Sequence, residues 1–377
     1  MDLSATLTDL AARLEQTEPG WRAFVGFDGF VDEIVRAVDI RYGPDSYKPI
    51  ETIAAFAQRI ADAAGLSTNI ELVTEHVKLG GNGPIMARAL SSLGAGITYV
   101  GSVGRPDVHP IFAELEQAGS VVGVCPPGYT QALEFTDGKV LLGKTTSLAE
   151  ITWERILDCF PLEAMRSALR ESALIAALNW TMIPHLTQVW EGMLRDGIAA
   201  LPAGVRPVAF FDLCDPAKRE PGEIVKALET IERFSERTHT VLGLNRKEAT
   251  EVANALGLAV APSNREAPLE AITEALGRKL GIAGVVVHPV SEAAVYTQGS
   301  LVKIPGPYTS RPKLTTGAGD NFNAGFCFGL VSGFDPASCL LLGKGTSGFY
   351  VRNGRSPSKH ELVQFLRTWA AHVDREF

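Results

Sequence analysis

Over most of its length the chain alternates between short apolar runs of β type and longer stretches with helical periodicity. This pattern favours parallel strands joined by helical crossovers, with helices on both faces of the sheet. We therefore expect one α/β domain over residues 1–377, with residues 1–20 adding an N-terminal helix. Strands are predicted at 22–28, 97–101, 121–124, 173–178, 207–212, 240–244 and 284–288. Helices are predicted at 2–16, 53–64, 84–93, 184–194, 223–234, 247–256, 269–280, 320–331, 336–351 and 361–373.

Three stretches depart from this alternation, near residues 33–42, 71–79 and 130–145, where polar residues are interleaved with apolar ones. Within the last, Thr136-Asp137-Gly138 is a hairpin signal. Strands that are polar on both sides suit a small exposed sheet projecting from the main body, either a lid or an ordinary surface hairpin. Exposed strand edges also favour pairing with a second subunit. We therefore expect a homodimer formed through these strands.

Charge and cysteine usage exclude several classes of protein. The 35 basic and 43 acidic side chains give a net charge of −8, so binding to nucleic acid or to an anionic membrane is not expected. The five widely spaced cysteines form no C-x-x-C pair, which argues against a disulfide scaffold or a zinc site. The first residues lack the features of a signal peptide, and no apolar run approaches the ~20 residues that span a bilayer. These observations predict a cytoplasmic protein.

The most informative segment lies at residues 315–320, Thr-Thr-Gly-Ala-Gly-Asp, directly before a predicted helix. Its glycines allow a ligand to approach the backbone, and amides at a helix N-terminus attract anions. Such a site suits the charge that builds on a transferred phosphoryl group. Asp320, ionised at neutral pH, could accept a proton from an attacking hydroxyl. The alternative is a glycine-rich turn with an ordinary helix-starting acid.

Two further segments combine a turn with polar groups. At residues 80–84, Gly-Gly-Asn-Gly-Pro, the glycines would let a polyol reach the backbone and Asn82, although a plain tight turn before a helix explains them equally well. Asn245 and Glu248 follow a predicted strand and could order the waters of a phosphate-bound Mg²⁺. Their spacing also matches a capping box, and the two roles are compatible. After another strand, residues 212–219 could line a site or form an Asp-Pro turn.

Two matches to nucleotide-binding patterns are weaker. Residues 138–145 satisfy G-x-x-x-x-G-K-[ST], and the apolar run 208–212 ends in the Asp that often accompanies it. A P-loop needs small residues between strand and helix, whereas this one carries Lys-Val-Leu-Leu, which suits the second arm of a hairpin. Residues 343–348 satisfy G-x-G-x-x-G, but a helical pattern precedes them instead of the required strand. A P-loop nucleotidase is kept as a minor alternative, and an oxidoreductase is not expected.

In this order, the three segments at 80–84, 245–248 and 315–320 resemble the PfkB-type carbohydrate kinases of the ribokinase-like superfamily, over about residues 22–370. The resemblance implies a three-layer α/β/α fold with a mostly parallel central sheet and a small projecting β-lid. It also implies phosphorylation of a sugar or sugar-like alcohol, with ATP and Mg²⁺ as cofactors. By similarity, Asp320 is the general base, and Gly317, Ala318 and Gly319 form an anion hole.

The resemblance also implies two sets of binding residues. Substrate contacts fall on Gly80, Gly81 and Asn82, together with an acid after the first strand, Asp32 or alternatively Asp28. Contacts to the nucleotide and the Mg²⁺–phosphate group fall on Asn245, Glu248, Gly343, Lys344, Ser347 and Asn353. The Mg²⁺ itself is expected to be held through phosphates and waters, without a direct protein ligand.

The chain departs from the family pattern at three places. Ile85 stands where the family usually has Asn, so Asn82 takes over that contact or the substrate presents different hydroxyls. Leu314 replaces an acid that commonly helps to hold a monovalent cation, which predicts weak or absent activation by K⁺. Residues 288–290, His-Pro-Val, replace a Thr-x-Gly nucleotide loop. These departures favour one alternative, a non-catalytic sugar or nucleotide sensor, whereas the intact Asp320 favours the kinase.

Overall fold

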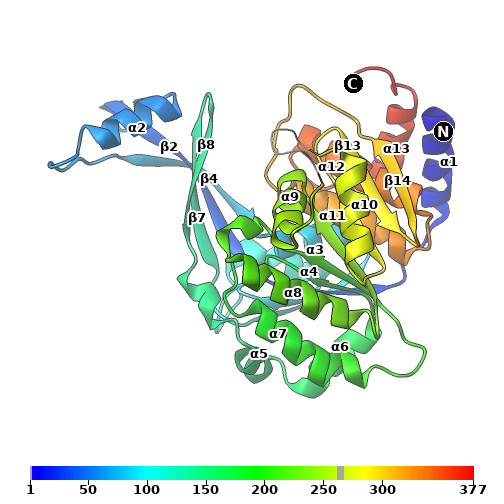
Figure 1. Cartoon of the computed structure of the whole chain (residues 1–377). Coiled ribbons are helices and arrows are strands. Elements are labelled where there is room, and N and C mark those ends of the chain that lie inside the picture. The colour runs from blue at the N-terminus through cyan, green and yellow to red at the C-terminus, as the bar shows by residue number, and fades with distance from the viewer. Residues whose placement is uncertain (1, 261–266) are drawn as a thin grey trace.

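The main sheet of the computed structural model, which describes residues 2–260 and 267–377, has nine strands within those residues. Their order is β14-β13-β12-β11-β10-β9-β1-β5-β6 (Figure 1). All neighbours from β6 to β12 run parallel, and β13 and β14 add an antiparallel edge. The mostly parallel sheet expected from the sequence is confirmed. The bounds are β1 Arg22–Phe27, β5 Gly96–Gly101, β6 Gly119–Gly123, β9 Ser172–Ala177, β10 Val208–Asp212, β11 His239–Leu244, β12 Gly284–Val287, β13 Glu292–Thr297 and β14 Ser300–Pro305.

Helices cover both faces of this sheet, and each face has its own hydrophobic core. The fold is therefore the three-layer α/β/α arrangement that the resemblance implied. One face carries α5 Trp153–Cys159, α6 Leu162–Glu171, α7 Leu186–Gly192, α8 Pro221–Phe234, α9 Arg246–Ala255 and α10 Leu269–Lys279. The other carries α1 Leu3–Gln16, α3 Asn82–Ser92, α4 Ala113–Ala118, α11 Ala318–Val331, α12 Pro336–Asn353 and α13 Lys359–Ala370.

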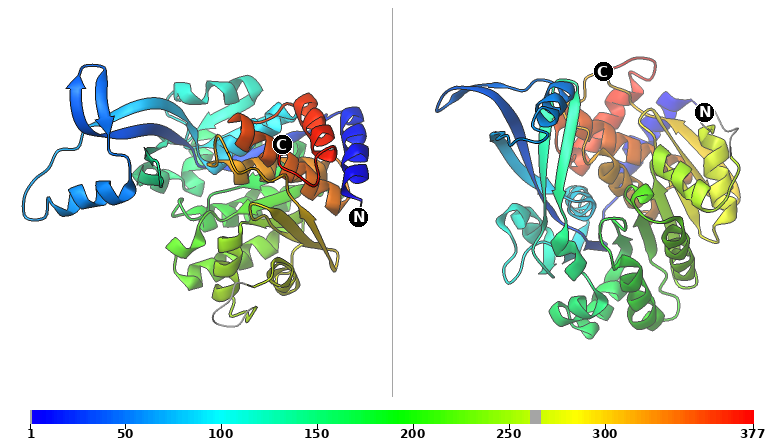
Figure 2. Two further views of the ribbon diagram at one scale, coloured as in Figure 1. Left: turned by 90° about the horizontal axis from the view of Figure 1, so that it is seen from above. Right: turned by 60° about the vertical axis from the view of Figure 1, so that its left-hand side comes forward.

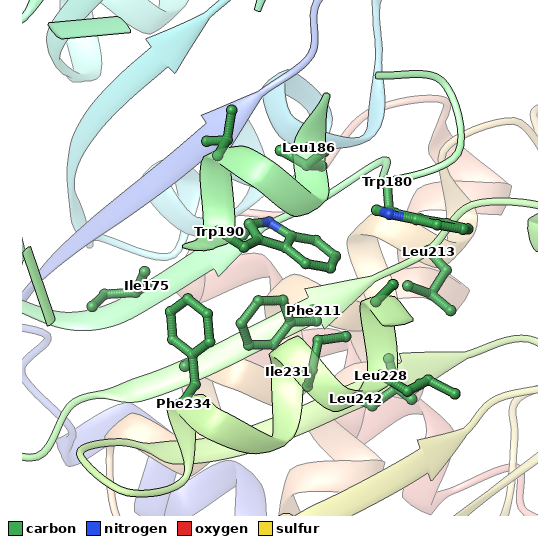
Figure 3. Packing of buried hydrophobic residues seen from close by; sticks show 14 of the residues in the cluster. Ile175, Trp180, Leu186, Trp190, Phe211, Leu213, Leu228, Ile231, Phe234 and Leu242 are labelled. Carbon is green, nitrogen blue, oxygen red and sulfur yellow. The ribbon is translucent and has the colours of Figure 1, made fainter. Parts of the chain in front are cut away.

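The two-residue period of the strands distributes their side chains between these cores. On β10, Phe210 belongs to one core and Phe211 to the other, as expected for successive residues of a strand. Phe211 lies edge-on to Trp190 of α7 and to Phe234 of α8, with ring centroids 5.0 and 4.9 Å apart (Figure 3). Burying an aromatic side chain of this size contributes about 1.5–3 kcal/mol, so such stacks fix α7 and α8 on the sheet.

Small residues bring α11 and α12 into close contact. A Cβ on Gly325 would lie 2.4 Å from the Thr346 hydroxyl, and one on Gly343 would lie 2.8 Å from the Phe322 ring. The G-x-G-x-x-G match at 343–348 therefore lies inside α12 and serves helix packing. The suggestion that Gly343 borders a nucleotide is corrected by this placement, because its α-carbon faces α11.

A second sheet of five strands extends away from the main body (Figure 2). It consists of β2 Phe30–Gly43, β3 Ser46–Pro49, β4 Leu72–Gly80, β7 Gly128–Phe135 and β8 Gly138–Lys144, and we call it the projecting sheet. Helix α2, Ile53–Ala61, packs on it through Ile53 and Phe56, which contact a small core that includes Leu133 and Phe135. The sequence pattern assigned this helix to the strand–helix alternation of the main body, and that assignment is wrong.

Strand β8 contains the P-loop-like residues. It pairs antiparallel with β7, from Phe135 opposite Gly138 to Tyr129 opposite Lys144. A P-loop uses consecutive backbone amides to surround a phosphate between a strand and a helix, whereas this segment is an extended hairpin arm. The P-loop alternative is therefore excluded. Among the described helices, none is both long and apolar enough to cross a membrane.

Candidate active site

A cavity of about 430 Å³ opens beyond the carboxyl ends of β10, β11 and β12, where ligands bind in open parallel sheets. The N-terminus of α11, one side of α12 and the loop before α11, through Pro307, Tyr308, Thr309 and Pro312, also form its walls. Of the residues singled out from the sequence, the cavity brings together Asn82, Asp212, Asn245, Glu248, Gly317, Ala318, Gly319, Asp320, Lys344 and Ser347. They come from five separate parts of the chain.

The turn before α11 presents amides to this cavity. Gly317 is the N-cap and has a φ of 92°, and a Cβ there would lie 2.7 Å from the Tyr350 hydroxyl. This position therefore requires glycine. Within the described chain, the amides of Gly317, Gly319 and Asp320 donate to no carbonyl or side chain of the protein. The Ala318 amide donates to the Thr315 carbonyl at 3.1 Å, so its assignment to an anion hole is corrected.

Asp320 is held in place by Asn82. The Asn82 side-chain amide donates to Asp320 Oδ1 at 2.8 Å, which joins the first turn of α3 to the first turn of α11. The carboxyl is 7% exposed and borders the cavity. Burial, then the nearby carboxyls of Asp212 and Asp28, raise the pKa of Asp320 well above its ordinary value. Asp320 therefore binds a proton more tightly than an exposed acid does, and its ionisation at neutral pH stays a prediction.

Asp28, the alternative sugar-binding acid, lies behind this contact. It is fully buried, and its carboxylate accepts the Asn82 and Gly83 amides at 2.9 and 2.8 Å and the Asn179 side-chain amide at 2.6 Å. Burial raises the pKa of Asp28 to about 6, although these hydrogen bonds oppose the shift. A carboxylate at the start of a helix satisfies amides that have no intrahelical partner. Asp28 therefore anchors α3 and does not border the cavity.

Asp212 and Glu248 face the same cavity as Asp320. Asp212 accepts the Asn323 side-chain amide at 2.8 Å and the Cys214 amide at 3.0 Å. Burial and the Glu248 charge raise the pKa of Asp212 well above its ordinary value, and burial raises the pKa of Glu248. Asp212, which the sequence offered as a site residue or part of a turn, lines the cavity. Concentrated negative charge of this kind favours a cation beside it.

Asn245 and Glu248 form the capping box anticipated from their spacing. Asn245 accepts the Glu248 amide at 3.0 Å, and Glu248 accepts the Asn245 amide at 2.8 Å and the Asp215 amide at 3.0 Å. Both Glu248 oxygens are therefore used in fixing the backbone. Both side chains line the cavity, and carboxylate and amide oxygens suit the waters of a phosphate-bound Mg²⁺, so the way in which the ion is held stays a prediction.

The far wall of the cavity is formed by residues 288–290 and by α12. The His288 ring stacks on Phe322 with centroids 4.4 Å apart, and Lys344 and Ser347 reach the cavity from α12. Asn353, also assigned to nucleotide contacts, is not among the lining residues. Its side chain donates to the Phe349 carbonyl at 2.9 Å near the C-terminal end of α12. The two residues at opposite ends of the 343–353 stretch are thus structural.

The projecting sheet approaches the same turn from the opposite side. The Lys139 ammonium of β8 donates to the Thr316 hydroxyl, and Tyr350 donates to the Thr316 carbonyl at 2.7 Å. Asp32 on β2 is half-buried, and burial raises its pKa against the opposing charge of Lys78 on β4. Lys78 and Lys139 were not predicted as site residues, because charged residues on exposed strands carry no pattern of their own.

The glycines assigned to substrate contacts make room for acids. A Cβ on Gly80 would lie 2.4 Å from the Asp32 carboxyl, and one on Gly81 would lie 2.8 Å from Asp28. Neither glycine lines the cavity, nor does Asp32. Asn82 is therefore the member of this group that the structure brings to Asp320.

Comparison with known proteins gives a consistent result. Residues 3–369 match the family model described as prokaryotic ketohexokinase. Ketohexokinase of Haloferax volcanii is 29% identical over 368 residues, which cover 96% of this chain and 95% of that protein.

Solved structures show the same fold. Ribokinase from Thermotoga maritima superposes with a TM-score of 0.62 at 17% identity, covering 92% of this chain and 99% of that chain. Arabidopsis thaliana ribokinase, complexed with ribose and ATP, gives 0.60 at 16% identity, covering 93% and 99%. The likeness thus extends over the whole length of both ribokinases.

Proposed function

The chain belongs to the prokaryotic ketohexokinase family and is a carbohydrate kinase, and on that premise we propose that it transfers the γ-phosphoryl group of ATP to a hydroxyl of a ketohexose. The observation that carries this proposal is the placement of Asp320, which borders the cavity, is fixed by Asn82 and adjoins unpaired main-chain amides. The ketohexose follows from the name of the family and of its relative; the site geometry itself specifies an alcohol.

Asp320 orients the acceptor hydroxyl and takes its proton. A raised pKa strengthens the carboxylate as a base, because the burial that disfavours its charge favours proton uptake. Asn82 leaves one Asp320 oxygen, Oδ2, for the hydroxyl, since it donates to Oδ1. Asn82 thus holds the Asp320 carboxylate in place, and Asp320 accepts the proton of the hydroxyl.

The amides of Gly317, Gly319 and Asp320 receive the charge that develops on the transferred group. They lie at the positive end of α11 and have no acceptor among the residues that the structure describes, so no hydrogen bond to those residues is broken when an anion arrives. Preorganised donors of this kind stabilise a transition state without reorganisation. A turn whose amides were already hydrogen-bonded to the protein could not bind an anion in this way.

Mg²⁺, when bound with ATP, would screen the phosphate charge. The residues suited to hold it through water are Asn245 and Glu248, with Asp212 on the neighbouring strand end. Lys139 of the projecting sheet contacts Thr316 beside the glycine turn, and its charge acts on Asp32 of the same sheet; these contacts support the proposal that the sheet acts as a lid over the sugar.

A coupled assay of ADP release over a panel of ketohexoses, aldoses, sugar acids and nucleosides tests the proposed activity, with phosphorus NMR to identify the product. We expect turnover with a ketohexose and ATP in the presence of Mg²⁺. Binding without ADP release across the panel would instead favour a sugar or nucleotide sensor. Turnover confined to nucleosides would refute the proposed acceptor.

We further propose that two chains associate through the projecting sheet. Val77, Tyr129, Leu141 and Leu142 on its strands are 44–54% exposed, although they are large and apolar. Sedimentation equilibrium would give twice the chain mass of 40.4 kDa for the dimer. A mass of one chain at micromolar concentration would refute this association.

A further inference from the structure

We propose that Lys344 is a positioning residue for the nucleotide: its ammonium ties the loop 288–290 to α12 and thereby keeps the cavity in the shape that binds ADP or ATP. The inference rests on the proposed use of ATP. Lys344 Nζ donates to the carbonyl of Pro289, and to that of Val290 at 3.1 Å. These carbonyls belong to the segment that replaces the Thr-x-Gly loop expected from the resemblance.

The Lys344 side chain is built into the wall of the cavity. It is 5% exposed, and its Nζ lies 5.6 Å from the centroid of the Phe322 ring, which in turn stacks on His288. Its methylene groups pass over Gly306, where a Cβ would lie 3.0 Å from Lys344 Cδ. A lysine this buried is uncommon unless a partner compensates for the loss of water. The two main-chain carbonyls are that partner.

The charge of this group depends on pH in the neutral range. Burial lowers the pKa of Lys344 to about 7, opposed by the carboxylate of Glu292 on β13. Lys303 on β14 pairs with Glu292 at 2.8 Å and so competes for that charge. His288 faces the ammonium from the end of β12. Burial, and then the Lys344 charge, lower the pKa of His288 to about 3, so His288 stays neutral above pH 6.

The sign of the effect follows from these contacts. Below pH 7 the ammonium makes charge-assisted hydrogen bonds to both carbonyls, which are about twice as strong as neutral ones. Above pH 7 the neutral amine holds them more weakly, so a smaller fraction of the protein has the binding-competent loop. With a pKa near 7, the protonated fraction falls from about 76% at pH 6.5 to about 3% at pH 8.5, which limits the loss of affinity to ~25-fold. Because the neutral amine can still donate hydrogen bonds to the two carbonyls, we expect a three- to tenfold loss of affinity.

The test is calorimetric titration of the full-length protein with ADP at pH 6.5, 7.5 and 8.5. The same titrations are made with Lys344→Met, Lys344→Arg and, as a control, Lys226→Met, which removes an exposed lysine of α8 that pairs with Glu191 and does not line the cavity. We expect the dissociation constant of the wild type and of Lys226→Met to rise three- to tenfold between pH 6.5 and 8.5. Lys344→Met should bind three- to tenfold more weakly at pH 6.5 and change little with pH beyond the titration of ADP itself.

Lys344→Arg stays charged throughout this range, so it should flatten the pH profile while binding better than Lys344→Met. Buffers of different ionisation enthalpy should also reveal proton uptake on binding at pH 8 that is smaller in Lys344→Met. Equal pH profiles for the wild type and Lys344→Met, in a chain that phosphorylates a sugar, would overturn this inference alone. A wild type with no affinity for ADP at any pH would overturn both the use of ATP and the inference.

Discussion

Replacing Asp320 with asparagine should abolish most of the activity without destabilising the protein. Asparagine can still accept the hydrogen bond from Asn82, but it cannot take a proton from the acceptor hydroxyl. Loss of a positioned general base typically costs ~10²–10⁴-fold in rate, or about 3–5 kcal/mol of activation free energy. Affinity for sugar and nucleotide should stay within a small factor, because neither depends on proton transfer.

The same variant should lose activity but gain stability at high pH. Since burial and nearby carboxyls raise the pKa of Asp320 in the folded state, its favourable contribution exists at low pH and is lost as the pH rises through the folded-state pKa. Above that pH, replacing Asp320 with asparagine removes a buried charge and should stabilise the folded protein. Each tenfold shift in proton affinity is worth about 1.4 kcal/mol. At ~2.1 cal/mol/K of unfolding entropy per residue, this is about 2 °C in Tm for 377 residues.

The assay combines steady-state kinetics with thermal denaturation at pH 5 and pH 8, and the gain in Tm should be larger at pH 8. Glu361→Gln serves as the control of opposite sign. The hydrogen bond from Arg355 lowers the pKa of Glu361 to about 2, and Glu361 caps α13 far from the cavity. This variant should lose stability and keep its activity. Near-wild-type turnover of Asp320→Asn would refute its role as the base, and a Tm several degrees lower would refute the electrostatic argument.

Three further changes give separate outcomes. Gly317→Ala forces a side chain into positive φ and against Tyr350, which costs about 1–3 kcal/mol and displaces the amides, so kcat should fall at least tenfold; unchanged kinetics would contradict the assigned turn geometry. Asp28→Ala leaves buried amides unpaired and should lower the free energy of unfolding by about 2–4 kcal/mol in urea titrations. An unchanged free energy of unfolding would indicate that Asp28 serves only to bind a ligand. With Leu314 in place of an acid, exchanging Na⁺ for K⁺ at constant ionic strength should change the rate less than twofold, and several-fold activation would contradict this.

The sequence predicted the seven parallel strands of the main sheet, because each of those strands is a short apolar run. Strands β3, β13 and β14 and helices α4, α5 and α6 were not predicted. Helix α4 spans six residues, too few to show a helical period, and the outer strand β14 has one buried residue, Ile304, so its hydrophobic pattern is weak. Helix α2 was recognised as a helix but placed wrongly, since an amphipathic pattern does not specify which sheet receives it.

In the candidate site, too, features with a local sequence signal were predicted, and contacts set by the tertiary fold were not. The glycine turn and Asp320 carry a local signal, and the structure brings them to one cavity. The capping box of Asn245 and Glu248 was also predicted, because its two residues lie three positions apart in the sequence. By contrast, the contact between Lys139 and Thr316 joins residues 177 positions apart, and no pattern in either segment indicates that the two meet. Charged residues on an exposed strand are ordinarily solvated, so their approach to the turn depends entirely on the tertiary fold.

Asp28, the alternative to Asp32 as the sugar-binding acid, has buried contacts that indicate a different role. It follows β1, which lies between β5 and β9, and its carboxylate joins Asn179 beyond β9 to the first amides of α3. The same turn of α3 presents Asn82 to Asp320. Asp28 therefore acts on Asp320 through Asn82, as well as through its own negative charge, which helps to raise the pKa of Asp320. The acid after the first strand thus affects the position and the basicity of another acid, and the contact of Asp32 with the sugar stays a prediction.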